Sequence, residues 1–216
     1  MDNFTAVTRD AIEHMVSIRG ADMDIPDLSK ELAQWATESV GTMAFDVRVG
    51  LYDDPPDKDT VKFVQATVDA LALQGKLSRG WESLFWKFFT TPTYRKFCEA
   101  RDTSYAMSQK IVDNKVAELK KMAEEGRAFD DNQTVPLLTY LLMKGELTPE
   151  EINMNSIGMF RAGVDTTSNA MLWLLYDLAN NPKVQERVYE EVLSLISPHG
   201  DFNSENLQSC STLKLV

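Results

Sequence analysis

Cysteine and histidine are scarce in this sequence. The 216 residues contain two of each, Cys98 and Cys210, and His14 and His199. Two cysteines so far apart indicate neither a disulfide framework nor a metal cluster. Two isolated histidines are also too few for a zinc site. We therefore expect neither disulfides nor a zinc centre to organise the fold.

Positive charge is also in short supply. Lys and Arg number 22 against 33 Asp and Glu, which gives a formal net charge of −11. Proteins that bind nucleic acid present basic surfaces to the phosphates. The acidic balance therefore argues against a nucleic-acid partner.

Long hydrophobic runs are missing as well. The longest uninterrupted apolar run is Ala170–Tyr176, far short of the roughly 20 residues that a bilayer helix needs. The first residues have neither the basic nor the apolar region of a leader peptide. Any export or anchoring signal is expected to lie outside this chain. The 44% hydrophobic and 25% charged residues are typical of a chain that buries a core.

Apolar residues recur every three or four positions through nearly the whole chain, and alternating, strand-like stretches are hard to find. This periodicity predicts an all-α fold. Residues 75–91 are expected to be irregular and aromatic, 126–131 to form a polar loop, and 204–216 to begin a further helix. Helices are predicted over residues 2–19, 27–48, 58–74, 92–125, 134–144, 148–180 and 182–197.

The helix predicted over residues 148–180 has a strong start. Thr148 can cap it, Pro149 suits its first turn and Glu151 completes a capping box. Residues 170–178 are apolar on nearly every face. We therefore expect this half of the helix to be buried on all sides.

The segment Phe160–Ser168 in this helix contains a run of locally unfavourable residues. Gly163 costs about 1 kcal/mol relative to alanine in a helix interior. The Thr166 hydroxyl can reach the carbonyl of Ala162, and Asp165 places a carboxylate beside an apolar stretch. Such a run in a buried element indicates function.

Proton delivery is the chemistry that this segment suggests. A loosened turn at Gly163 would let a ligand or water approach the backbone, and Asp165 beside the alcohol of Thr166 can relay protons. A purely structural interpretation is also open. Asp165 could pair with Arg161 one turn earlier, and the threonines could merely bend a core helix.

The sequence Ala162-Gly-Val-Asp-Thr-Thr167 matches the pattern [AG]-G-x-[DE]-T-[TS] at every position. It resembles the central-helix motif of the cytochrome P450 family, the haem-thiolate monooxygenases. The step from this helix into the next, over residues 174–192, resembles the same family. Residues 31–50 and 86–102 resemble its mitochondrial-type subgroup.

The resemblance implies that residues 1–216 are a single incomplete domain: the central helical part of the cytochrome P450 fold, with its sheets and haem-ligand loop missing. Thr166 would hydrogen-bond dioxygen at the haem, and Asp165 would be the acid behind it. The residues implied to lie at the cofactor are Ala162, Gly163, Thr166 and Thr167, and those implied to face substrate are Asn155, Gly158 and Met159.

Two motifs that the family requires are not found. The E-x-x-R pair is expected on a helix that would follow this sequence, and the literal match at Glu124–Arg127 is typical of a solvated charge run. Neither Cys98 nor Cys210 has the glycines of the family's cysteine loop. Because a thiolate ligand drives O–O cleavage in these enzymes, we expect this chain alone to be inactive.

The parent reaction implied is hydroxylation of a lipophilic small molecule, with dioxygen and with electrons from a ferredoxin. The implied location is the matrix side of the mitochondrial inner membrane. The aromatic and basic stretch Trp81–Phe89 suits a membrane interface, but it could equally close an ordinary core. The alternative function is a non-catalytic helical binding protein produced by truncation.

Overall fold

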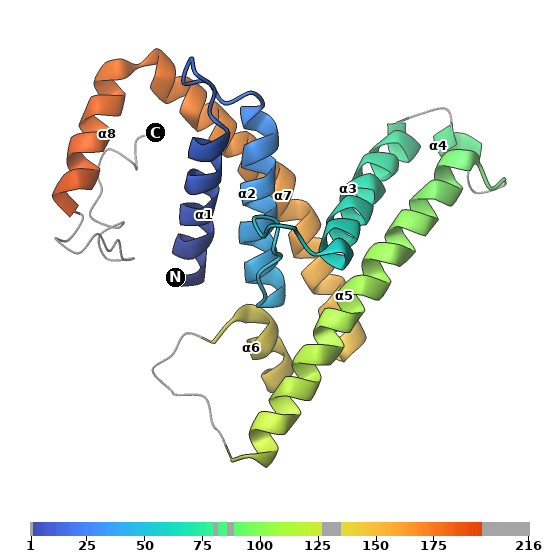
Figure 1. Cartoon of the computed structure of the whole chain (residues 1–216). Coiled ribbons are helices and arrows are strands. Elements are labelled where there is room, and N and C mark those ends of the chain that lie inside the picture. Colours follow the sequence, from blue (N-terminus) through green and yellow to red (C-terminus); the bar gives the residue numbers. More distant parts are fainter. Residues whose placement is uncertain (1, 80–81, 86–88, 127–134, 196–216) are drawn as a thin grey trace. The chain divides into compact units, whose positions relative to one another are not determined.

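The computed structural model describes residues 2–79, 82–85, 89–126 and 135–195. Within these residues every regular element is a helix, which confirms the all-α prediction (Figure 1). The helices are α1 (Asp2–Ile18), α2 (Leu28–Phe45), α3 (Lys58–Arg79), α4 (Glu82–Phe85), α5 (Pro92–Glu124), α6 (Leu137–Lys144), α7 (Pro149–Asn180) and α8 (Pro182–Leu195).

Local capping sets the starts of the longer helices, as the sequence predicts. Thr148 Oγ1 accepts from the Glu151 backbone N–H at 3.2 Å, while Glu151 Oε2 accepts from the Thr148 N–H at 2.8 Å. These bonds are the two halves of a capping box at the start of α7. At α2, where the sequence offers two candidate caps, Asp27 Oδ1 accepts from the Lys30 N–H at 3.0 Å.

The prediction that residues 75–91 are irregular is wrong in two places, because α3 continues to Arg79 and α4 forms over Glu82–Phe85. Gly75 weakens a helix by only about 1 kcal/mol. Its carbonyl accepts bonds from Ser78 Oγ and Arg79 Nε, and Leu77 in the same turn is buried. Tertiary burial therefore outweighs the local propensity. Most of the expected loop at 126–131 and all of 204–216 lie outside the described residues.

Residues 36–165 form one of two compact units. Its core joins α2, α3 and α7 through Phe45, Phe63 and Phe160, whose ring centroids lie 5.3–6.0 Å apart. Helix α5 packs along α3, where the buried hydroxyls of Thr67 and Ser104 share a 2.6 Å hydrogen bond. The apolar residues packed around these rings are Val40, Ala44, Ile157 and Val164.

The second unit consists of residues 1–35 and 166–216. Trp35, near the middle of α2, is buried, donates from Nε1 to Thr8 Oγ1 at 3.2 Å, and packs edge-on against Phe4 of α1. His14 Nε2 lies 3.2 Å from Glu31 Oε2.

The expectation that residues 170–178 are buried on all sides is wrong for the described structure. Trp173 is 64% exposed and Tyr176 is 59% exposed. An apolar helix becomes buried all round only when other elements cover every side, and the described residues leave these side chains uncovered. Among the described helices, none combines the length and the apolar character that crossing a membrane requires.

Candidate functional site

Packing in the first unit fixes which side of α7 faces the core. Ile157, Phe160 and Val164 are buried at three- and four-residue spacing. They pack in the aromatic core with residues of α2 and α3. Positions three and four apart share one face of a helix. Most of the predicted site residues between them therefore face elsewhere, although Met159 packs partly against this core.

The predicted site residues follow the opposite side of α7. Asn155, Gly158, Ala162, Asp165 and Thr166 are all exposed. The remaining three, Met159, Gly163 and Thr167, are half-buried at its edge. The spacing of three and four residues from Asn155 to Gly158, Ala162 and Thr166 gives one stripe. Four of the predicted residues therefore share one exposed side of the helix, whereas Met159 packs partly against the aromatic core and Gly163 lies against Val40.

The expected loosened turn at Gly163 is a prediction that the structure corrects. Helix α7 is continuous through this residue. A methyl group added at Gly163 would lie 2.8 Å from Cγ1 and 3.1 Å from Cγ2 of Val40 on α2. Gly163 therefore serves a close approach between two helices, a role that glycine alone can fill without a shift of the neighbouring side chain.

Arg161 contacts α3 rather than the acid one turn along its own helix. Its Nη2 donates to Gln74 Oε1. Partial burial lowers the pKa of the Arg161 guanidinium from its ordinary value, because burial disfavours the charged form. The pairing of Arg161 with Asp165, which the sequence left open, is not the contact made here.

The exposed stripe of α7 fits one face of a flat cofactor such as haem. Its residues are small at Gly158 and Ala162, and an added Cβ at Gly158 would have open space around it within 4 Å.

Neither cysteine is shown in a position to serve as the axial ligand of a haem iron. Cys98 lies within α5, half-buried, where its thiol hydrogen-bonds Tyr94 and raises the pKa of that phenol. Cys210 lies outside the described residues, among which no group of side chains could hold a metal ion.

Sequence reasoning missed a buried carboxylate that organises the end of α2. Glu38 is fully buried and accepts from Arg48 Nε at 2.9 Å, from the Gly50 N–H at 3.1 Å and from the Leu51 N–H at 3.0 Å. The available signal was an acid on the apolar face of α2 followed, ten residues later, by an arginine. Such a carboxylate must be paired to be stable.

The aromatic stretch Trp81–Phe89 is only partly described. Leu84 and Phe89 are exposed, whereas Trp81 and residues 86–88 lie outside the described residues.

Comparison with known proteins identifies a family that matches the chain as well as its Ala162–Thr167 motif. The model of the family described as "Cytochrome P450" matches residues 1–216. Cytochrome P450 10 of Lymnaea stagnalis is 26% identical over 211 residues, covering 97% of this chain and 37% of the relative. The mitochondrial sterol 26-hydroxylase of Homo sapiens is 26% identical over 198 residues, covering 90% of this chain and 36% of the relative.

A probable mitochondrial cytochrome P450 12c1 of Drosophila melanogaster is 29% identical over 217 residues, covering 97% of this chain and 39% of the relative. Among solved structures, the haem domain of cytochrome P450DA matches with a TM-score of 0.74 at 16% identity, covering 98% of this chain and 42% of that one. The fold is therefore that of part of such a domain. The chain spans about two fifths of the length of these relatives.

Proposed function

Because this chain belongs to the cytochrome P450 family, whose model matches residues 1–216, we propose that it forms the central helical part of a haem-thiolate monooxygenase. Residues 1–216 are then one incomplete domain of that enzyme. The observation that carries the proposal is the complete Ala162–Thr167 motif within α7, in which Ala162, Asp165 and Thr166 are exposed.

Asp165 and Thr166 carry the proton chemistry in this proposal. When bound, haem with a thiolate ligand supplies the cleavage of dioxygen. The Asp165 carboxyl would be protonated from solvent, and the Thr166 hydroxyl would donate its own proton into the site while it regains one from that acid. Ala162, small and exposed, keeps that face low so that the cofactor can approach. Gly163 beside it lets α7 lie close to Val40 of α2. Thr167 lies beside them at the edge of the site.

Asn155, Gly158 and Met159 line the substrate in this proposal. They precede the oxygen-handling residues by one to three turns on the same side of α7. The substrate is a lipophilic small molecule, hydroxylated with dioxygen and with electrons from a ferredoxin. The relatives named as mitochondrial, one of them a sterol 26-hydroxylase, support this class and a mitochondrial location. The matrix side of the inner membrane is part of the same proposal.

This chain alone is proposed to be inactive, because Cys98 lies within a helix and has no loop around it. The test is to add haem to the chain, reduce it and expose it to carbon monoxide. We expect no thiolate-type absorption band. The appearance of that band would contradict the proposal.

The catalytic roles are tested on the product of the whole reading frame, supplied with haem, a ferredoxin and its reductase. Thr166→Ala and Asp165→Asn should each lower hydroxylated product per electron pair by about tenfold or more, since positioned acids contribute at least that much, and should release peroxide instead. Asp177→Asn, which removes another exposed acid from α7, is the matched control and should leave the coupling unchanged. Equal coupling in all three variants would rule out the assigned roles.

A non-catalytic binding function is the second candidate, and the exposed ring pair of Trp173 and Tyr176 is the observation that favours it. The reading frame beyond Val216 discriminates the two. A stop codon directly after Val216 would favour binding, whereas an E-x-x-R helix and a cysteine loop would favour the enzyme.

A further inference from the structure

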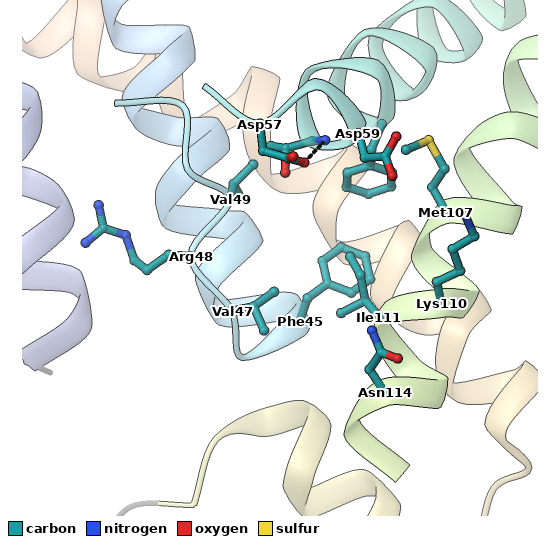
Figure 2. A pocket seen from close by; sticks show the side chains of 12 residues that line it. Phe45, Val47, Arg48, Val49, Asp57, Asp59, Met107, Lys110, Ile111 and Asn114 are labelled. Carbon is teal, nitrogen blue, oxygen red and sulfur yellow. Dashed lines mark hydrogen bonds between the residues drawn. The ribbon is translucent and has the colours of Figure 1, made fainter. Parts of the chain in front are cut away.

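A cavity of about 270 Å³ lies in the first unit, between the segment after α2, the start of α3 and the middle of α5 (Figure 2). The rings of Phe45 and Phe63 and the side chain of Ile111 line it. Val47 and Val49 line it from the segment after α2. The volume is near the lower end of the range for small-molecule sites, roughly 300–1,000 Å³. The cavity shares no residue with the Ala162–Thr167 motif.

The wall that carries Val47 and Val49 is held in place by buried and part-buried hydrogen bonds. Glu38 accepts from Arg48 Nε and from the N–H groups of Gly50 and Leu51 at 2.9–3.1 Å. On the other side of Val47, Asp46 Oδ2 accepts from both the N–H and the Oγ1 of Thr139 at 2.7–2.8 Å. Because the segment is fixed at both ends, the cavity keeps its shape without a ligand. Binding there therefore costs little conformational entropy of the protein.

The charged side chains around the cavity are separated by sign, with two acids at one edge and a lysine opposite them. Asp57 and Asp59 lie together at the edge where α3 begins, and Lys110 of α5 lies across from them (Figure 2). Arg48 points away from the cavity and binds Glu38. Within the described part of the chain neither acid has a cation at ion-pair distance. The Thr60 N–H lowers the pKa of Asp57, so this carboxylate stays ionised at neutral pH.

We propose that this cavity binds a small organic cation with an apolar body and one protonated amine. The body fills the space over Phe45, Phe63 and Ile111, and the amine lies beside the carboxylates of Asp57 and Asp59. At about 30 Å³ for each non-hydrogen atom, the volume of one water molecule in the liquid, the cavity holds a ligand of about nine or ten such atoms.

The test uses the 216-residue chain and three probes of one shape: 3-phenylpropylamine, 3-phenylpropan-1-ol and 3-phenylpropanoate. NMR titration follows ligand line broadening. We expect saturable binding of the amine in the low-millimolar range and weaker binding of the alcohol and the carboxylate. Tighter binding of the carboxylate, equal binding of all three, or no saturable binding of the amine would overturn the proposal.

Two variants locate the site. Asp59→Asn should weaken amine binding about threefold or more, the loss expected for one partly exposed charge pair. Asp69→Asn removes an exposed acid from the same helix outside the cavity and should change nothing. Val47→Phe should block the amine by filling the cavity from its exposed wall. If Val47→Phe loses helicity by circular dichroism, the test depends on the amine affinities of Asp59→Asn and Asp69→Asn. Equal affinities of these two variants would refute the site.

Discussion

Glu38 shows how one residue can organise a turn. Its carboxylate is fully buried and accepts three hydrogen bonds, two of them from the backbone of the segment after α2. A buried carboxylate that loses its charge leaves these donors with a weaker acceptor. The stability of residues 46–51 therefore depends on this side chain.

Glu38→Gln should destabilise the chain by about 2–3 kcal/mol, because hydrogen bonds to a buried charged group are lost or misaligned. Urea unfolding followed by circular dichroism measures the change. Glu118→Gln, which removes the partner of an exposed pair with Lys115, is the control and should cost less than about 1 kcal/mol. Equal losses in the two variants would show that burial of Glu38 is not the cause.

Gly163 and Gly158 are two glycines of α7 in different surroundings. An added Cβ at Gly163 would collide with Val40, whereas one at Gly158 would have open space within 4 Å. Glycine lowers helix stability by the same intrinsic amount at both positions. A comparison of the two positions therefore isolates the tertiary contact.

Gly158→Ala should stabilise the chain by up to about 1 kcal/mol through helix propensity. Gly163→Ala should destabilise it by about 1–2 kcal/mol, since overpacking outweighs the same gain. Urea unfolding of the Gly163→Ala, Val40→Ala and double variants gives the coupling between the two sites, and the double variant should recover part of the loss. A stabilising Gly163→Ala would contradict the close approach.

At the scale of elements, the start of α3 depends on a charged cap. Asp57 Oδ2 accepts from the Thr60 N–H at 2.9 Å, and this bond lowers the pKa of Asp57 from its ordinary 3.8. A carboxyl whose pKa is lower in the folded chain stabilises that state above the unfolded pKa. Its contribution disappears as the pH falls through the folded pKa.

Asp57→Asn keeps a capping oxygen but cannot ionise. The wild-type chain should therefore lose stability more steeply than this variant as the pH falls through 3.8, the ordinary pKa of the carboxyl, and below it. The measurement is the free energy of unfolding of both proteins at several pH values. Parallel curves for wild type and Asp57→Asn would show that the cap does not titrate as described.

At the scale of the whole molecule, α7 and α8 expose large apolar side chains. Trp173 and Tyr176 pack edge-on at 5.8 Å between centroids while both remain mostly exposed. Exposed apolar patches of this kind promote association. The 216-residue chain should therefore self-associate in solution.

Trp173→Ser combined with Tyr176→Ser should shift the chain toward the monomer in sedimentation velocity, with unchanged helical circular dichroism. Tyr189→Ser removes a single exposed ring from α8 and should have a smaller effect. A wild-type chain that sediments as a monomer and unfolds in one sharp transition would contradict this prediction.

The sequence by itself determined that the chain is helical and where the longer helices begin. Thr148, Glu151, Thr91 and Asp27 cap groups only three residues away, so these starts follow from local chemistry. The match of Ala162–Thr167 to a family pattern likewise required only neighbouring residues, and the comparison over residues 1–216 agrees with it.

Only the tertiary structure decided what each side of these helices meets. The role of Gly163 follows from Val40, which lies far away in the sequence, and α3 continues past Gly75 because Leu77 is buried. The exposure of Trp173, the bonds of Glu38 and the cavity beside Asp59 also depend on packing or on contacts beyond a single helical turn. Periodicity fixes which residues share a face, but burial depends on which other elements cover that face.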